Sequence, residues 1–224
     1  MPKIKMPRGT PSLDMTPMVD LGFQLVTFFI LTAKFRPQEP VIVDTPYSQS
    51  QKEIREKNML ITIDTEGRVF FDLSGPEIRK NMILQAGDSA FPALKGKMSE
   101  QFIERFQTMG AFGVPTANLY EYVMADGPRR ADMDEAAPGI PTDSLNNELW
   151  IWIQYGGTEF VRDAKANLNL TDKDLRDPKK GLNYTIKADG ETPYGKIKNV
   201  IDTFRDLELY TFNLITGQER ETTD

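Results

Sequence analysis

The chain of 224 residues contains no cysteine and no histidine. The missing cysteine excludes disulfides, thiolate metal sites and cysteine nucleophiles, and the missing histidine excludes a serine–histidine pair. Histidine is also the side chain that most often exchanges protons near neutral pH, so a proton-handling site must use another group. Because the sequence offers no nucleophile–base pair and no metal-binding set, we expect no enzyme activity, no metal and no cofactor.

Basic residues are fewer than acidic ones: the chain has 27 Lys and Arg and 33 Asp and Glu, which gives a net charge of −6 and a pI near 4.9. A nucleic-acid partner therefore has no electrostatic support. The mean hydropathy of −0.44 and the hydrophobic content of 39% are those of a soluble protein of one or two domains. Long hydrophobic runs are scarce too, and the stretch 18–33 is the exception, with Asp20 and Gln24 as its strongly polar members.

The stretch 18–33 permits three interpretations: a buried core helix, a cleaved signal peptide and an uncleaved membrane anchor. A signal peptide requires a basic start and a small-residue cleavage site. The basic start is present, but Asp20 interrupts the apolar middle and the sequence TAKFRP contains no such site. A core helix has one polar face, whereas apolar residues cover most of the circumference here. The pattern therefore favours a transmembrane helix at 15–35.

The orientation of this helix follows only weakly from the flanking charges. Basic residues lie on both sides of it, at Lys3, Lys5 and Arg8 before the helix and at Lys34 and Arg36 after it. The short basic tail, residues 1–14, is the favoured cytoplasmic side.

The polar residues of the predicted span share one helical face. At about 100° per residue, Gln24 and Thr27 fall within about 40° of Asp20. A charged carboxylate inside a membrane is costly, and such residues usually face a bundle interior or a water-filled path, often as proton relays. Apolar surroundings disfavour the charged form of a carboxyl group, so Asp20 is a candidate proton carrier. The alternative is that Asp20 lies at the helix start, beside Pro17, and complements the helix dipole; the shared face with Gln24 and Thr27 favours the first interpretation.

The segment LDMTPMVDLGFQLVTFFILTAKF resembles the single transmembrane helix of the ExbD/TolR family of biopolymer transport proteins. The resemblance rests on Thr16 and Pro17, followed by two apolar residues and Asp20. In that family the matching aspartate is the protonatable residue of the channel, so the resemblance assigns this role to Asp20. Gln24 and Thr27 are inferred from the helical face alone.

Two further segments resemble the same family. VIVDTP is similar to the family linker, with Val41, Val43 and Pro46 in register and Thr45 where leucine is usual. The carboxy-terminal YTIKADGETPYGKIKNVIDTFRDLELYTFNLIT resembles the last strand, helix and strand of the periplasmic domain. The region between Gly75 and Asn147 is longer than the family leads us to expect.

The resemblance implies a proton-motive-force-driven subunit of the bacterial inner membrane. Two copies, of this chain or of this chain and another ExbD-like protein, would lie inside an ExbB/TolQ-like pentamer surrounded by lipid. A TonB- or TolA-like transducer would receive the work for outer-membrane transport. The alternatives are a membrane-anchored periplasmic module that binds peptidoglycan or an outer-membrane partner, and an accessory subunit without an active proton site.

The expected fold is a single transmembrane α-helix, a flexible linker and a small α/β (α+β) periplasmic domain with helices packed on a β-sheet. Residues 36–58, rich in Pro, Ser, Gln and charge, form the linker, and 59–224 form the domain, with a long insertion at about 75–147. MLITIDTEGRVFFDL predicts a hairpin. Pro76 and Gly87 mark the start and stop of a helix, and Ser99 caps a second helix with an apolar face.

The remaining segments give weaker signals. The Gly- and Pro-rich stretch from Gly110 to Pro141 suggests a loop, and its acidic residues, Asp126, Asp132, Asp134 and Glu135, lack the spacing of a calcium loop. ELWIWIQYGG fits a strand or a helix equally. In the tail, alternation from Leu182 predicts a strand, Thr192 and Pro193 begin a helix, and alternation from Tyr210 predicts a final strand.

Overall fold

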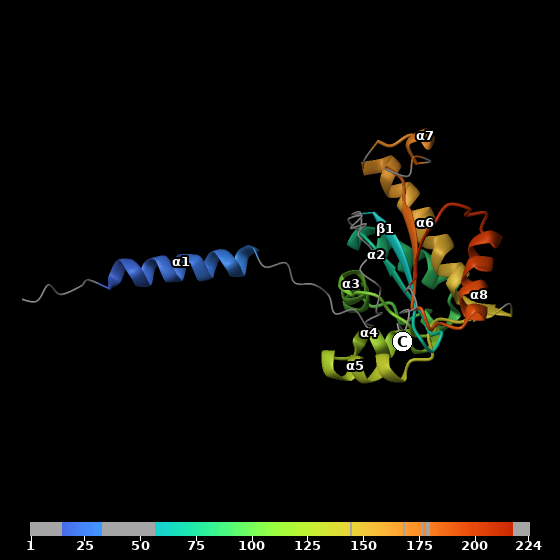
Figure 1. Ribbon diagram of the computed structural model, residues 1–224, viewed down its shortest axis with the longest axis horizontal. Coiled ribbons are helices and arrows are strands. Elements are labelled where there is room, and N and C mark those ends of the chain that lie inside the picture. The colour runs from blue at the N-terminus through green and yellow to red at the C-terminus, as the bar shows by residue number, and fades with distance from the viewer. Residues whose placement is uncertain are drawn as a thin grey trace, which may run out of the picture. The chain divides into compact units, whose positions relative to one another are not determined.

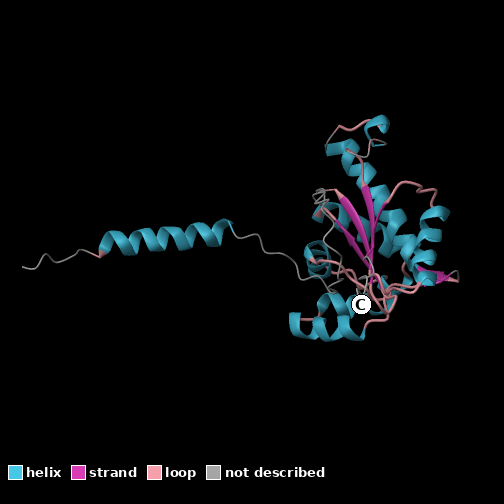
Figure 2. Cartoon of the chain, in the orientation of Figure 1, coloured by secondary structure: helices cyan, strands magenta, loops and turns pink. Residues whose placement is uncertain are grey.

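The computed structural model describes residues 15–32, 57–143, 145–167, 169–175, 177 and 180–216. The chain divides into two units, Met1–Pro37 and Gln38–Asp224. In the first unit, helix α1 comprises Thr16–Thr32 (Figures 1 and 2). The predicted tail 1–14, the end of the predicted span at 33–35 and the linker residues Val41, Val43 and Pro46 lie outside the described residues.

None of the helices in the described ranges combines the length and the apolar character needed to cross a bilayer.

The second unit is built on a four-stranded sheet with the order β2-β1-β5-β6. Its strands are β1 (Asn58–Ile63), β2 (Val69–Leu73), β5 (Asn183–Ala188) and β6 (Asn213–Thr216). β1 and β2 form the predicted antiparallel hairpin, while β5 is parallel to both β1 and β6. The hairpin closes at Gly67, whose φ of 77° lies in the left-handed region that favours glycine.

Helices and a small hairpin complete the second unit. They are α2 (Pro76–Ser89), the 3₁₀ turn η1 (Pro92–Leu94), α3 (Glu100–Thr108), α4 (Thr116–Met124), α5 (Gly127–Ala136), β3 (Thr142–Asp143), β4 (Asn146–Asn147), α6 (Glu148–Asn167), α7 (Asp172–Leu175) and α8 (Tyr194–Asp206). The expectation of helices packed on a sheet is therefore confirmed for this unit (Figure 2).

Alternation along the strands directs one set of side chains into the core. Met59, Ile61 and Ile63 of β1 are 0% exposed. Helix α6 packs directly on β1 and β2, because a Cβ added at Gly156 would meet Met59 and Leu73. On β5, the ring of Tyr184 lies 5.8 Å from that of Phe204 in α8.

The three sequence signals for the ends of α2 and α3 have different outcomes. Pro76 occupies the first turn of α2 as predicted, because a proline there lacks only an N–H that has no partner within the helix. The stop at Gly87 is wrong: α2 continues to Ser89. Gly87 serves packing instead, since a Cβ there would clash with the sulfur of Met98. The cap at Ser99 is confirmed, and its hydroxyl accepts a hydrogen bond of 3.2 Å from the Phe102 backbone N–H.

The expectation of a loop between Gly110 and Pro141 is also wrong, because this segment contains α4 and α5. Two of its prolines stand at helix starts and not in loops: Pro115 is the N-cap of α4, and α5 has a proline in its first turn. The segment also joins the sheet, since Phe112 forms a β-bridge with Phe71.

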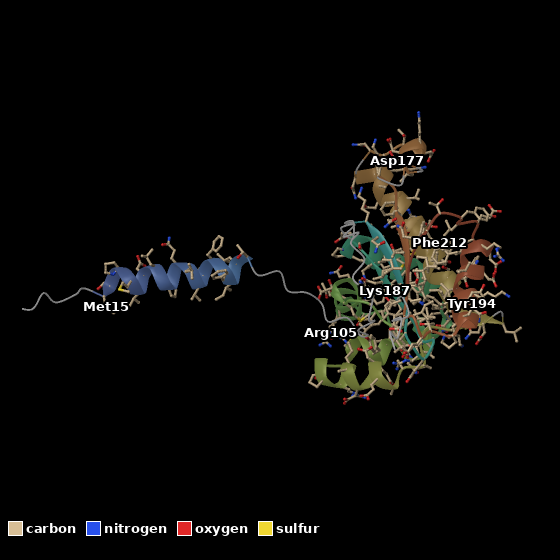
Figure 3. All side chains as sticks on the ribbon, in the orientation of Figure 1. Met15, Arg105, Asp177, Lys187, Tyr194 and Phe212 are labelled. Carbon is tan, nitrogen blue, oxygen red and sulfur yellow. The ribbon has the colours of Figure 1, made fainter. Side chains whose placement is uncertain are left out.

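The carboxy-terminal elements largely follow the expected pattern. ELWIWIQYGG, which fitted either element, lies in α6, and its Trp152, Ile153 and Gly156 share the buried face of that helix. The tail forms strand, helix and strand as predicted, although β6 begins at Asn213 and not at Tyr210. Tyr194, at the start of α8, is 75% exposed (labelled in Figure 3).

Candidate functional site

The start of α1 places Asp20 one turn beyond the helix terminus. The Met15 carbonyl accepts hydrogen bonds of 3.1 Å from the backbone N–H groups of Met18 and Val19. Pro17 lies in this first turn, where a missing N–H costs least. The first turn contains no acidic residue. Asp20 therefore lies outside the turn in which a capping side chain satisfies backbone N–H groups.

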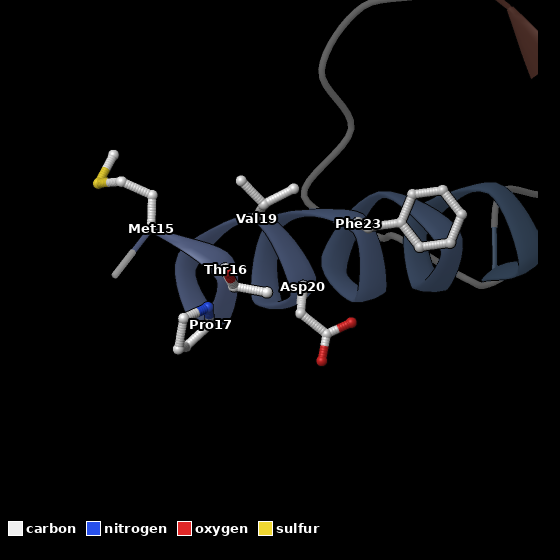
Figure 4. Close-up of a pocket in the computed structure, with 6 residues that line it drawn as sticks. All are labelled: Met15, Thr16, Pro17, Val19, Asp20 and Phe23. Atoms are coloured by element: carbon white, nitrogen blue, oxygen red, sulfur yellow. The ribbon is translucent and has the colours of Figure 1, made fainter. Parts of the chain in front are cut away.

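Six residues surround an open hollow at this end of α1: Met15, Thr16, Pro17, Val19, Asp20 and Phe23 (Figure 4). The Asp20 carboxylate points away from the helix axis, on the side where Thr16 and Pro17 lie, and Val19 points to the opposite side (Figure 4). Within the part of the chain that the structure describes, no group donates a hydrogen bond to this carboxylate. The carboxylate is therefore open to a partner from outside its own helix.

Gln24 and Thr27 follow Asp20 at the spacing that puts all three on one face of α1. The Thr27 hydroxyl donates a 2.9 Å hydrogen bond to the Phe23 carbonyl, and the Thr32 hydroxyl bonds the Phe28 carbonyl in the same way at 2.8 Å. Bonding of this kind satisfies a hydroxyl within its own helix. The Thr27 hydroxyl can therefore only accept a further hydrogen bond from a neighbouring molecule. The side chains of Asp20 and Gln24 keep their full hydrogen-bonding capacity.

Every other side of α1 presents apolar side chains. All residues from 16 to 32 are exposed, and the large apolar ones are Met18, Val19, Leu21, Phe23, Leu25, Val26, Phe28, Phe29, Ile30 and Leu31. A contiguous apolar surface of this kind marks a site that another molecule or a membrane covers. α1 is therefore a helix that requires apolar surroundings on most of its circumference and tolerates polar ones along Asp20, Gln24 and Thr27.

The second unit holds several buried polar groups, and their partners assign them to the fold. The Glu148 carboxylate accepts hydrogen bonds of 2.8 and 2.9 Å from the backbone N–H and the hydroxyl of Thr116, at the start of α4. Arg79 donates to Asp72 and to the Gly110 carbonyl, both at 2.7 Å, and burial lowers the pKa of its guanidinium. The Arg79–Asp72 bond links the insertion to β2 of the sheet, and the Glu148 bonds link it to α6.

Glu159 is a buried charge that the sequence analysis missed. It lies on the core side of α6, where its side chain is 1% exposed, and Arg162 approaches it to 3.1 Å from the surface. Burial raises the pKa of the Glu159 carboxyl group, and the nearby Arg162 opposes that rise. The signal that would have found Glu159 is its spacing from Trp152 and Gly156, which precede it by seven and three residues on one helical face.

No cation site was found among the described residues of either unit: none of their His, Cys, Asp or Glu side chains gather in threes to hold a metal. The acidic run of the insertion is instead used in part by the fold, because Asp134 accepts a 2.6 Å hydrogen bond from the Tyr122 hydroxyl.

Comparison with known proteins places the site in a family context. Residues 6–102 match the family described as biopolymer transport protein ExbD/TolR. This range includes the whole of α1, β1, β2 and α2, and it ends inside α3. The chain is also similar to the biopolymer transport protein ExbD of Aquifex aeolicus (strain VF5), with 26% identity over 116 residues, which are 48% of this chain and 86% of that protein. No solved structure matches the chain.

Proposed function

We propose that this chain, which belongs to the ExbD/TolR family through its residues 6–102, is a proton-driven subunit of an inner-membrane transport complex. It would reside in that membrane as a single-pass protein, with the tail 1–14 cytoplasmic and the second unit periplasmic. ExbB/TolQ-like proteins would form the rest of the channel, and a TonB- or TolA-like transducer would receive the work. The chain is not an enzyme in this proposal, because the work consists of proton transfer and motion.

The observation that carries the proposal is the setting of Asp20. Its carboxylate projects from a helix whose other faces are apolar and exposed, and no described residue bonds it. Inside an apolar sleeve, a charged carboxylate would be strongly disfavoured unless water or a polar group reaches it. Binding a proton neutralises the side chain, and losing it restores the charge. Each step therefore changes which surface of the sleeve the Asp20 face packs against most favourably.

Gln24 and Thr27 extend the polar face in this proposal. The Gln24 amide both donates and accepts, and the Thr27 oxygen retains acceptor capacity beside its bond to Phe23. Together with Asp20 they would line the side of α1 that meets water or polar groups of the channel. The remaining apolar faces would contact lipid, the pentamer or the α1 of a second ExbD-like copy.

The test is gradient-dependent outer-membrane uptake by cells carrying Asp20→Asn. The asparagine keeps size and hydrogen bonding but cannot release a proton, so we expect energised uptake to fall to the level of a deletion strain while the chain still co-purifies with its ExbB/TolQ-like partner. Asp20→Glu, which keeps the carboxylate, should retain part of the activity. Asp14→Asn, in the predicted tail, is the matched control and should leave uptake unchanged. Wild-type uptake by Asp20→Asn would refute the motor and favour the tether interpretation.

A further inference from the structure

Helix α5 is attached to the second unit in an unusual way, because it buries none of its own side chains. Its neighbours in the insertion differ: α3 buries Phe102 and Phe106, and α4 buries Leu119 and Tyr122. Burial of apolar surface is the main force that holds a helix to a core, at roughly 25 cal/mol per Å². On α5, Met133 is only partly buried where it packs against the core, so apolar burial is small and polar contacts supply most of the attachment.

Arg130 makes the first set of these contacts. It lies on α5 and donates hydrogen bonds to three carbonyls at the end of α4: Tyr122 at 3.4 Å, Val123 at 3.2 Å and Ala125 at 3.1 Å. Its guanidinium also lies over the Tyr122 ring, 5.6 Å from the centroid. A cation at a helix carboxy terminus is stabilised by the helix dipole.

Asp134 and Arg68 make the second and third sets. The Tyr122 hydroxyl donates a 2.6 Å hydrogen bond to the Asp134 carboxylate, on the last turns of α5. Arg68, which precedes β2, donates to the backbone carbonyls of Asp134 at 3.4 Å and Glu135 at 2.8 Å. Apart from the packing of Met133, these contacts to α5 are hydrogen bonds that water can replace, at a net cost far below their strength in isolation.

In contrast to α5 itself, the residues that flank it are held in place by burial. Ala125 and Ala137, which flank the helix, are 7% and 5% exposed. Ile140, three residues further on, is 3% exposed, and its backbone N–H donates to the Val69 carbonyl of β2 at 2.9 Å. Arg105 of α3, labelled in Figure 3, donates a hydrogen bond of 2.8 Å to the Met124 carbonyl. This bond holds the end of α4 independently of α5. A polar middle therefore lies between two buried attachment points.

We propose that α5 is a releasable strap: residues Asp126 to Ala136 detach from α4 and from Arg68 while the rest of the second unit stays folded. Release breaks the bonds of Arg130, Asp134 and Arg68 and exposes the carboxy terminus of α4 together with the buried Tyr122 ring. A free helix of this length is marginal in water, so the released strap unwinds. The strap opens at lower free energy than the core, as expected for a segment with few apolar contacts.

The test is amide hydrogen exchange, followed by mass spectrometry, on the full chain solubilised with its membrane partners. In wild type, the amides of 129–136 should exchange at least about tenfold faster than those of β1 and α6, because only local opening is needed. Arg130→Ala should speed exchange in α5 by about tenfold or more and leave β1 and α6 within about twofold.

Two matched controls lie on α5 itself. Arg129 and Asp132 are exposed, so Arg129→Ala and Asp132→Ala should change α5 exchange by less than about twofold, whereas Asp134→Ala should act like Arg130→Ala. Wild-type protection of α5 equal to that of β1 and α6 would overturn the proposal without any variant. Equal effects of Arg129→Ala and Arg130→Ala, or a rise in exchange throughout the domain, would also overturn it.

Discussion

Phe71 of β2 and Phe112 of the insertion exchange two backbone hydrogen bonds, of 2.9 and 3.0 Å, at the outer edge of the sheet. Their rings also meet edge to face at 5.8 Å, and Phe112 lies 5.1 Å from the Trp152 ring of α6. The Ile140 N–H covers the same edge at Val69. An uncovered edge strand invites pairing with another chain, so the insertion protects β2 as well as enlarging the core.

Truncation of this contact should destabilise the second unit strongly. Phe112→Ala removes a ring that is 0% exposed, and such a change typically costs about 3–5 kcal/mol of unfolding free energy. Urea unfolding followed by tryptophan fluorescence measures the loss, since Trp152 lies in the same cluster. Tyr210→Ala, at a side chain that is 75% exposed, is the control and should change stability by less than about 0.5 kcal/mol. Equal stability of wild type and Phe112→Ala would show that the insertion is not part of the core.

Two glycines with similar backbone angles should respond differently to alanine. Gly139 and Gly96 have φ values of 84° and 77°, so a side chain at either costs about 1–2 kcal/mol. A Cβ at Gly139 would also meet the backbone N of Val69 at 2.6 Å, whereas one at Gly96 meets nothing within 4 Å. We therefore expect Gly139→Ala to lower the urea midpoint clearly more than Gly96→Ala. Matching midpoints would mean that the chain at Gly139 does not lie against β2.

The buried Glu159 carboxyl group should make stability depend on pH. Burial raises its pKa in the folded state above the ordinary value of 4.5, so the unfolded chain loses this proton first as pH rises. Below pH 4.5 both states keep the proton, and the stability that the protonated Glu159 contributes is fully present. This stability is lost as the pH rises from that value through the folded pKa. Glu159→Gln removes the effect.

Urea unfolding of wild type and Glu159→Gln at a series of pH values measures the contribution of Glu159. Subtracting the two curves cancels the other titrating groups, among them Asp134, whose pKa burial also raises. We expect wild type to lose stability relative to the variant as pH increases above the ordinary carboxyl range. Parallel curves would contradict the burial of an ionisable Glu159.

Local signals in the sequence predicted those elements that local physics decides. The hairpin of β1 and β2 follows from alternation around Gly67, and the start of α3 follows from the hydroxyl of Ser99. α8 begins after Pro193 as expected. In each of these cases, the residues that determine the element lie within it or beside it.

Elements that depend on distant contacts were not predictable in the same way. The stretch around Trp152 fits the periodicity of a strand and that of a helix. In the structure it is a helix, and the Trp152 ring packs against the rings of Phe71, Phe91, Phe106 and Phe112. Composition alone also hid α4 and α5, whose prolines stand at their starts. The role of Asp20 depends on other chains, so its sequence prediction stays a prediction, as do the roles of Gln24 and Thr27 on the same face of α1.

Proton flux through the reconstituted complex tests the role of Asp20 most directly. Vesicles would contain the chain with its ExbB/TolQ-like partner, a pH-sensitive dye inside and an imposed proton gradient. A parallel measurement with a sodium-sensitive dye and a sodium gradient would identify the ion. With Asp20 as the proton carrier, flux should be present in wild type, fall to that of protein-free vesicles in Asp20→Asn and remain unchanged in Asp14→Asn. Undiminished flux through Asp20→Asn, in a complex of unchanged composition, would contradict the account.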